Sequence, residues 1–420
     1  MSTSPPHDPY LALRFRDFRL FMTASLVASL GAQMLVLAIG WELYQRTNSA
    51  LALGIVGLVQ IVPILLLALV AGHIADRYNR KAIVTLAQVV MVLSALGLAG
   101  LSTIGGPLIA IYGCLLLRGL GAAFSGPASS ALLAEVIPEE AFENSASWRS
   151  SFGQVASVAG PAIGGFLIAI FHGTTVNYLL SALGSLIFVV ALFFVRVQPS
   201  RHPAKQRERP TLRSLGEGIA FLRRTPVVLS AITMDLFAVL FGGATALLPI
   251  FARDILGVGP EGLGWLQAGP AIGAVCVGLY LAHRPPLQKA GPTFLLAVTG
   301  FGLSTIIFGL SRSFWLSLAM LFSLGALDCV SMVIRETLML TRIPNEMRGR
   351  VNAIEGVFVS SSNQLGGFES GVTAQLFGPV LSVVGGGVGT LIVVLVIAGV
   401  APELRSLRTL RQETREVVLS

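Results

Sequence analysis

The chain has 420 residues, of which 54% are hydrophobic and only 12% are charged, and its formal net charge at pH 7 is +8. Soluble domains carry roughly 25% charged residues, so this composition excludes a soluble globular protein. Its apolar runs reach the roughly 20 residues that one bilayer crossing needs at about 1.5 Å per residue. We therefore expect an all-α polytopic membrane protein.

Apolar runs bounded by Gly, Pro and charged residues predict twelve transmembrane helices. The first six are expected at 18–44, 50–75, 82–103, 107–132, 146–171 and 175–197. The second six are expected at 227–251, 261–283, 291–311, 313–341, 351–377 and 380–400. The predicted domains are an N-terminal six-helix bundle (1–197), a cytoplasmic basic linker (198–226), a C-terminal six-helix bundle (227–401) and a cytoplasmic tail (402–420).

The basic residues are distributed unevenly between the two sides of the predicted membrane. Of the 29 Lys and Arg residues, 23 fall in the N-terminal segment, the even-numbered loops and the C-terminal tail. Only Arg46, Arg253 and Arg312 fall on the other side. Because basic loops stay in the cytoplasm, both termini are predicted to be cytoplasmic. The same bias explains the high net charge without a nucleic-acid partner.

The two predicted halves share short sequences at an offset of 206 or 207 residues. Gly57-Leu-Val-Gln60-Ile-Val-Pro63 matches Gly264-Trp-Leu-Gln267-Ala-Gly-Pro270, and Ile137-Pro138-Glu-Glu140 matches Ile343-Pro344-Asn-Glu346. Gly119 matches Gly325, and Gly160 matches Gly366. Matches at four places with one offset indicate a duplicated unit of six helices.

The loop after the second predicted helix has the sequence Gly72-His-Ile-Ala-Asp76-Arg77-Tyr-Asn-Arg80-Lys81. It resembles the signature loop of the major facilitator superfamily, Gly-x-x-x-Asp-Arg-x-Gly-Arg-Arg/Lys. Asn79 replaces the second Gly and is expected to tolerate the same left-handed turn. The resemblance implies two parallel six-helix repeats with the substrate bound between them near the middle of the membrane.

The same resemblance implies a cytoplasmic latch that holds the two halves together in one state of the transporter. Asp76 is expected at the positive N-terminus of the helix that starts near Val351, and Arg77 or Arg80 is expected to pair with Glu135. The predicted latch residues are Gly72, Asp76, Arg77, Arg80, Lys81 and Glu135. The alternative is that these charges only fix the topology.

The fifth predicted helix contains Gly160-Pro161-Ala-Ile-Gly164-Gly165. In the major facilitator superfamily this sequence resembles the antiporter motif of proton-linked exporters. Because small residues also let helices approach closely, generic tight packing is the alternative.

Charged and polar residues inside the predicted helices are candidates for proton coupling and substrate binding, because a charge at that depth costs roughly 3 kcal/mol on insertion scales. A coupling acid must change its protonation state, which burial makes easier by disfavouring the charged form. The predicted set is Asp328, Asp235, Glu355, Glu369, Arg118 and Asn363. In related exporters an Arg at the place of Arg118 has a coupling or substrate role. For each of these charged residues a structural role is the alternative.

Three further charges are given lesser roles. Arg335 follows Asp328 by seven residues, about 10 Å along a helix, so the two are not expected to pair. Arg335 and Glu336 are interpreted as contacts near the cytoplasmic end of the helix, and Glu42, beside Trp41, as an interfacial residue.

Enzyme activity is not expected, because the chain has no His cluster, no Gly-x-Ser-x-Gly elbow and no phosphate-binding Gly-x-x-x-x-Gly-Lys-Ser/Thr loop. No cofactor is therefore predicted, and an ion gradient must supply the energy. Phe15–Phe21 and Trp41–Ser49 resemble the bacterial efflux branch that holds the enterobactin exporter and macrolide efflux pumps.

The resemblance implies a monomeric inner-membrane protein that exports amphipathic small molecules, drugs or siderophores, in exchange for protons. Its predicted partners are the substrate, protons and the lipid bilayer. An importer or uniporter on the same fold and a non-transporting receptor or assembly partner remain alternatives.

Overall fold

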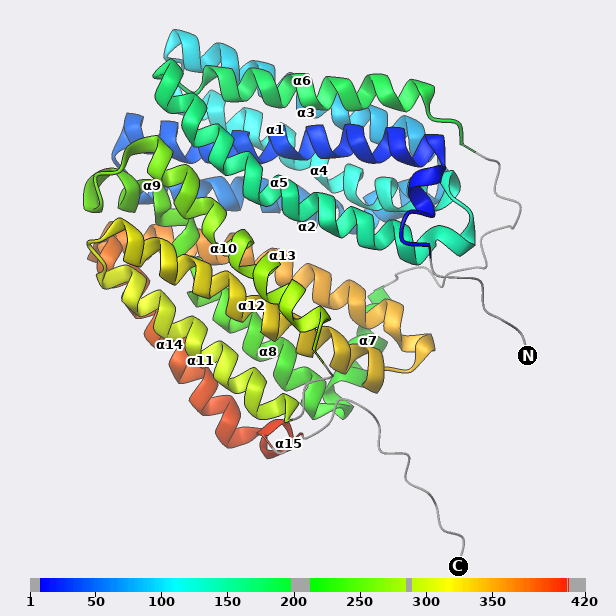
Figure 1. Cartoon of the computed structure of the whole chain (residues 1–420), viewed down its shortest axis with the longest axis vertical. Coiled ribbons are helices and arrows are strands. Elements are labelled where there is room, and N and C mark those ends of the chain that lie inside the picture. The colour runs from blue at the N-terminus through cyan, green and yellow to red at the C-terminus, as the bar shows by residue number, and fades with distance from the viewer. Residues whose placement is uncertain (1–7, 198–211, 285–288, 406, 408–420) are drawn as a thin grey trace, which may run out of the picture. The chain divides into compact units, whose positions relative to one another are not determined.

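The computed structural model describes residues 8–197, 212–284, 289–405 and 407, apart from the side chains of some residues inside the helices. Within these residues, eleven helical stretches are long and apolar enough to cross a membrane. A twelfth long helix, α13 (Asn345–Phe377), carries Glu355, Asn363 and Glu369 and is therefore less apolar. The predicted all-α fold of twelve helices is confirmed (Figure 1).

The helices lie close to their predicted positions, with ends that differ by six residues at most, except that α8 ends ten residues before the predicted end of the seventh span. The first six are α1 (Arg16–Thr47), α2 (Ala50–Arg77), α3 (Arg80–Ile104), α4 (Leu108–Val136), α5 (Phe142–Phe171) and α6 (Thr175–Phe194). The later helices include α8 (Pro226–Phe241), α10 (Gly259–Ala282), α11 (Ala290–Leu310), α12 (Phe314–Arg342) and α14 (Pro379–Val400).

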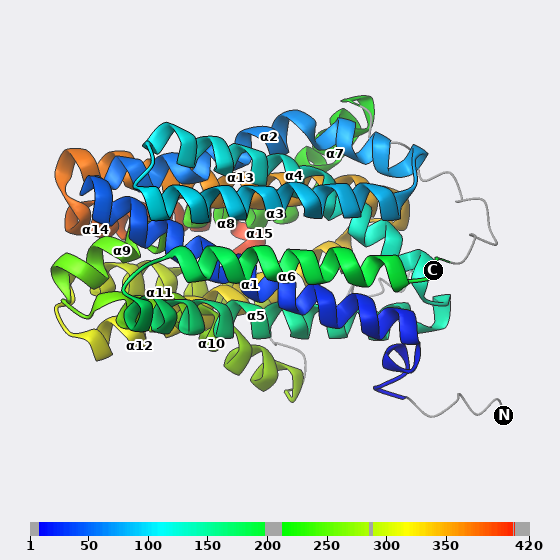
Figure 2. The same cartoon turned by 90° about the horizontal axis from the view of Figure 1, so that it is seen from above.

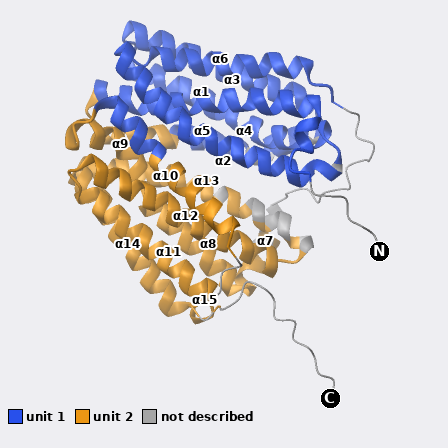
Figure 3. Ribbon diagram, viewed as in Figure 1, with its two compact units in different colours: residues 1–46, 59–207, 259–268 blue, residues 47–58, 208–258, 269–420 orange. Residues whose placement is uncertain are grey.

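The chain divides into two compact units (Figure 3). Unit 1 comprises residues 1–46, 59–207 and 259–268, and unit 2 comprises residues 47–58, 208–258 and 269–420. The helices α2 and α10 are therefore each shared between the units. In unit 1, α3 packs along both α4 and α6 (Figure 2), and in unit 2 α11 packs along α12 and α14.

The seventh predicted span is not one continuous α-helix. α8 ends at Phe241, a 3-10 turn covers Gly243–Leu247, and the short α9 (Leu248–Ile250) leads into a π-helical turn over Phe251–Ile255. The break follows from a close approach, because a Cβ added to Gly243 would lie 2.4 Å from the carbonyl oxygen of Gly366 on α13. Adjacent glycines at 242 and 243 allow both the approach and the change of helix type.

Part of the segment predicted as a linker is helical. Here α7 (Leu212–Arg224) leads into α8, and its buried Leu222 packs with Ile232, Ile343 and Ile354. Later in the sequence of unit 2, α15 (Pro402–Arg405) is anchored by the buried Leu404. The predicted domain boundaries themselves stay a prediction.

The duplicated residues make equivalent contacts in the two units. In unit 1 a Cβ on Gly119 of α4 would lie 2.8 Å from the Gln60 carbonyl oxygen of α2, with Pro63 next to it. In unit 2 a Cβ on Gly325 of α12 would lie 1.8 Å from the Pro270 carbonyl oxygen of α10. The glycine thus lets the fourth helix of each half cross the second helix closely, at the Gln-x-x-Pro sequence that both second helices contain.

A second duplicated glycine behaves in the same way. Gly160 of α5 lies against Leu30 and Gln33 of α1, and Gly366 of α13 lies against Val239 and Leu240 of α8. Residues that are related by the sequence offset therefore make equivalent contacts between helices in the two halves.

We expect Gly325→Ala to destabilise unit 2 by about 3 kcal/mol or more, because the added methyl overlaps backbone that has no free rotamer to move. Thermal unfolding of the purified protein in detergent measures this effect. The matched control is Gly278→Ala on α10, where the new Cβ would meet only Cys329 Sγ, at an ordinary 3.6 Å. Equal stability of the two variants would contradict the close helix crossing.

Candidate functional site

A buried cluster of charged side chains lies inside unit 2. Arg335 of α12 donates from Nε to Oε1 of Glu355 on α13 at 2.8 Å, and its guanidinium also pairs with Asp235 of α8. The side chains of Arg335 and Asp235 are each 8% exposed and that of Glu355 is 16% exposed. One cation therefore connects three helices through ion pairs that water scarcely reaches.

The depth of these residues in their helices explains why they meet. Asp235 is nine residues from the start of α8, Arg335 is seven from the end of α12, and Glu355 is ten from the start of α13. At about 1.5 Å per residue, all three lie roughly 10–15 Å from the same end of the bundle. A charge at this depth needs a partner, and each of the three has one.

The interpretation of Arg335 as a contact near the helix end is therefore wrong, since it is the centre of the cluster. The number of residues between each of these charges and its predicted helix end can be counted in the sequence. Comparing the three counts indicates that Asp235, Arg335 and Glu355 lie at the same depth.

Asp328 lies beside this cluster without joining the ion pairs. It lines a small cavity of about 10 Å³, the room of roughly one water molecule, together with Asp235 and Ser331. Among the described residues, Asp328 makes no hydrogen bond or ion pair, and the buried Ser331 hydroxyl has no partner either. As expected, Asp328 and Arg335 do not pair directly. The site thus has a carboxylate that no cation holds.

The structure brings together only part of the predicted coupling set. Asp235, Asp328 and Glu355 converge, whereas Glu369 follows Glu355 by fourteen residues, roughly 21 Å along α13. Glu369 accepts a 3.4 Å hydrogen bond from Ser370, and the exposed Asn363 donates to the Val359 carbonyl at 2.9 Å. Glu355 and Glu369 fall on one face of α13 because they are fourteen residues apart, but they do not belong to the same site.

The remaining predicted member, Arg118, lies half-buried on α4 in unit 1. No hydrogen bond or ion pair of its side chain is recorded within the described residues. Its coupling role stays a prediction.

The predicted latch loop lies between α2 and α3. Arg80 pairs with Glu135 at the end of α4, the partner that the sequence offered to Arg77 or Arg80. The Arg80 Nε also donates to the Ala75 carbonyl at 3.3 Å, Arg77 is exposed, and Gly72 has open space around it. The side chain of Asp76 lies outside the described residues.

The expectation for Asn79 is wrong. Its φ is −59°, and its side-chain oxygen accepts a hydrogen bond from the Ala82 N–H at 3.1 Å. Asn79 is therefore the N-cap of α3 rather than a left-handed turn residue, which explains why Asn serves here in place of Gly.

The motif on α5 is fully packed. Gly160, Pro161, Gly164 and Gly165 are all buried. A Cβ on Gly164 would lie 3.2 Å from Met34 Cα of α1, and one on Gly165 would lie 2.4 Å from the Pro260 carbonyl oxygen, also in unit 1. The motif therefore brings neighbouring backbones close to α5, and this packing is compatible with either of its two interpretations.

Glu42 is buried within the protein, with 6% of its surface exposed, which its predicted place at the end of the helix did not indicate. It pairs with Arg46 and accepts hydrogen bonds from Thr174 and from the Tyr178 hydroxyl, the latter at 2.7 Å. Arg46 in turn donates to the carbonyl of Gly106 at 3.0 Å. This network ties the end of α1 to α6 and to the turn between α3 and α4.

We expect Glu42→Gln to lower the free energy of unfolding by about 2 kcal/mol, because it removes the buried carboxylate that pairs with the partly buried Arg46 and accepts from Thr174 and Tyr178. The exposed Glu261 supplies a matched control, since Glu261→Gln should change stability by about 0.5 kcal/mol or less. Thermal unfolding in detergent compares the two. A Glu42→Gln variant as stable as the control would show that the network contributes little.

Comparison with known proteins places these features in a family context. The sequence pattern of the transmembrane secretion effector family matches residues 7–416. The chain is 28% identical over 396 residues to the enterobactin exporter EntS of Shigella dysenteriae serotype 1 and to that of Escherichia coli O1:K1, covering 93% of each protein.

Solved structures are similar in fold. The nucleoside transporter NupG has a TM-score of 0.70 at 9% identity over 91% of this chain and 98% of its own. A bacterial homologue of the human lysosomal transporter Spinster has a TM-score of 0.70 at 14% identity over 95% of this chain and 97% of its own. At these identities the likeness shows a shared transporter fold.

Proposed function

Because this chain belongs to the transmembrane secretion effector family of major facilitator transporters, we propose that it exports amphipathic small molecules of the drug or siderophore class in exchange for protons. That it is a multi-pass transporter follows from the family. The substrate class, the proton coupling and the alternating-access cycle are the proposal.

The observation that carries the proposal is the buried cluster of Arg335, Asp235 and Glu355 with Asp328 beside it. One guanidinium is paired with two carboxylates of low exposure, so the ion pairs carry an excess of negative charge when both acids are ionised, and the exposed Asp328 beside them adds to it. Uncompensated charge in a low-dielectric interior is strongly unfavourable. Binding a proton restores the balance, and this makes the cluster suited to couple proton movement to conformation.

In the proposed cycle, a proton reaches Asp328 and then Asp235, and protonated Asp235 no longer holds the charge of Arg335. Arg335 then pairs with Glu355 alone, so the contacts among α8, α12 and α13 change. Release of the proton to the other side restores the first arrangement. Coupling arises because each protonation state favours a different conformation, and the substrate path opens to the two sides in turn.

Two features support export rather than import. The family description concerns secretion, and EntS of Shigella dysenteriae and Escherichia coli, to which the chain is similar, is an enterobactin exporter. The α5 motif resembles that of proton-linked antiporters. The named substrate of those relatives, enterobactin, supports the siderophore class, and the many apolar side chains of the helices fit amphipathic molecules in general.

The proposed location is the bacterial inner membrane, with both termini in the cytoplasm. The uneven distribution of Lys and Arg supports this orientation. A monomer is the proposed working unit.

The test is efflux from bacterial cells that lack their own major pumps and express this chain, with and without a protonophore. The substrates are a fluorescent lipophilic cation, a macrolide and a catecholate siderophore. Efflux that the protonophore abolishes supports the antiporter. Protonophore-resistant efflux contradicts proton coupling, and uptake in place of efflux contradicts the direction.

The control for this assay is the same cells expressing the Gly278→Ala variant, whose substitution meets only an ordinary contact. This variant should transport as the unaltered protein does. A loss of efflux in it would show that the assay responds to expression or folding rather than to the site.

A further inference from the structure

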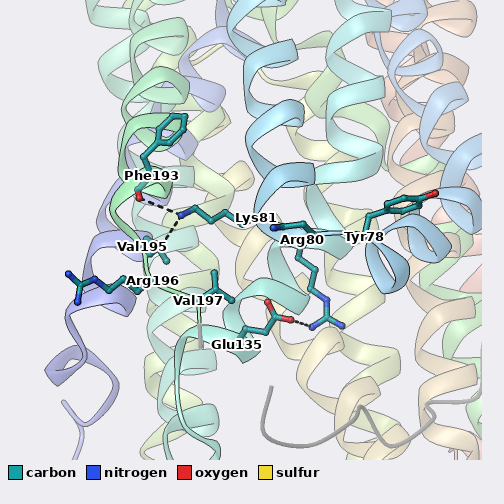
Figure 4. A pocket seen from close by; sticks show the side chains of 9 residues that line it. Tyr78, Arg80, Lys81, Glu135, Phe193, Val195, Arg196 and Val197 are labelled. Carbon is teal, nitrogen blue, oxygen red and sulfur yellow. Dashed lines mark hydrogen bonds and ion pairs between the residues drawn. The ribbon is translucent and has the colours of Figure 1, made fainter. Parts of the chain in front are cut away.

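A large pocket lies at the end of unit 1 that carries the α2–α3 loop, and no residue of the buried charge cluster lines it. Its volume is about 650 Å³, and its walls come from the start of α3, the end of α4 and the chain just after α6 (Figure 4). This volume is within the range of roughly 300–1,000 Å³ found for small-molecule sites. The proposed export mechanism gives it no role.

The pocket is predominantly basic. Arg80, Lys81 and Arg196 line it together with a single acid, Glu135, which is paired with Arg80. The excess of cations among the lining residues favours an anionic ligand. Among the residues whose side chains the structure describes, Asp17 is a further acid near the pocket, and its Oδ1 accepts the backbone N–H of Arg196 at 3.1 Å, which fixes the chain after α6.

Lys81 is held in a defined position at the pocket wall. Its ammonium donates to the Val195 carbonyl at 2.9 Å and the Phe193 carbonyl at 3.4 Å, at the end of α6 (Figure 4). An ammonium has three N–H donors, so one remains to meet a ligand oxygen. The two carbonyl bonds hold the cation in place before any ligand arrives.

The surroundings of the pocket are those of a membrane boundary. Phe193, which lines it, is 70% exposed, and the next residue, Phe194, is 60% exposed. On the adjacent α3, Leu86 is 66% exposed and Leu93 is 60% exposed. In a membrane protein such apolar surface faces hydrocarbon, so a basic pocket opens next to a surface that acyl chains cover.

We propose that this pocket binds the phosphate group of an anionic phospholipid, with positive charge supplied by Lys81 at its wall and by the exposed Arg196 at its rim, and with Phe193 beside the acyl chains. A soluble phosphate ester would meet the same cations but would leave the aromatic surface unused. The lipid is therefore the ligand that fits both parts of the site.

The experiment measures phosphatidylglycerol binding to the full chain in detergent by native mass spectrometry, with phosphatidylcholine as the neutral reference lipid. Each cation that contacts the phosphate directly is expected to contribute a factor of about 5 or more to its binding, because hydrogen bonds between charged groups are the stronger ones. Lys81→Gln combined with Arg196→Gln should therefore weaken phosphatidylglycerol binding about 25-fold. Binding of phosphatidylcholine should be unchanged.

Two controls make the outcome decisive. Arg14→Gln combined with Arg19→Gln removes the same charge from exposed positions of unit 1 outside the pocket, and should weaken binding less than about twofold. Equal loss in both pairs would overturn the site in favour of general surface charge. Arg196→Gln alone, at an exposed position, should weaken binding about fivefold, and no loss there would also overturn the proposal.

Glycerol 1-phosphate distinguishes the two sources of phosphate. A lipid site should keep its phosphatidylglycerol when this soluble ester is added in excess, because the ester cannot use the apolar surface. Displacement of the lipid by the ester would overturn the lipid assignment and indicate a site for a soluble phosphate.

Discussion

Arg335→Gln is expected to reduce proton-driven efflux to background and to lower the free energy of unfolding by about 3–5 kcal/mol. Removing one partner of a buried ion pair leaves the other charge uncompensated, and here two carboxylates, Asp235 and Glu355, lose the same cation. The loss of transport follows separately, because the cation whose partners are proposed to change with protonation is gone. Efflux assays and thermal unfolding measure the two effects.

The matched control for this variant is Arg342→Gln, seven residues further along α12 and exposed. It removes the same charge from the same helix without entering the cluster, and it should keep both efflux and stability. If Arg335→Gln transports as well as this control does, the cluster is not part of the coupling machinery.

A second substitution separates stability from transport. Combining Arg335→Gln with Asp235→Asn and Glu355→Gln removes all three charges of the ion pairs, so it should recover most of the lost stability. Transport should stay at background, because Asp328 can still take up a proton but no ion pair is left for that proton to change. Recovery of proton-driven transport in this triple variant would show that the cluster only stabilises the fold.

The sequence predicts the helices well because hydropathy and length depend on each segment by itself. The shared offset of Gly119 and Gly325 also predicts a duplicated unit, and the structure places both glycines at equivalent helix crossings. The break at Gly243 is different. It depends on how closely Gly366 of α13 approaches, which is a tertiary distance that no property of the segment 227–251 reveals.

In the candidate site, too, some features follow from a single helix and others depend on tertiary contacts. Helix periodicity places Glu355 and Glu369 on one face, but one face of a long helix passes through several environments along its roughly 50 Å length. The structure pairs Glu355 with Arg335 and leaves Glu369 with Ser370. Similarly, the sequence places Glu42 near the end of α1, whereas its burial results from Tyr178 and Thr174, more than 130 residues later.

Asp328→Asn is expected to abolish substrate accumulation driven by a pH gradient while preserving substrate exchange. Asp328 is the carboxylate beside the cluster that no cation holds in the described residues, and its small cavity also contains Asp235 and Ser331. It is therefore the acid best placed to accept a proton first. Asn keeps its size and polarity but binds no proton, so conformational exchange continues without coupling.

The measurement uses proteoliposomes with a substrate identified by the efflux panel. One assay follows accumulation under an imposed pH gradient, and the other follows exchange of labelled for unlabelled substrate with no gradient. Glu336→Gln is the matched control, because Glu336 lies on the same helix and is exposed as Asp328 is, but it neither lines the small cavity nor takes part in the ion pairs. It should keep both activities.

The three outcomes of these assays lead to different conclusions. Loss of accumulation with exchange intact assigns the proton to Asp328, because only the coupling step has failed. Loss of both activities indicates that Asp328 contributes to substrate binding or to the conformational change itself. Full accumulation excludes Asp328 as the proton carrier and shifts the assignment to Asp235, the one other carboxylate that shares the cavity and that already contacts Arg335.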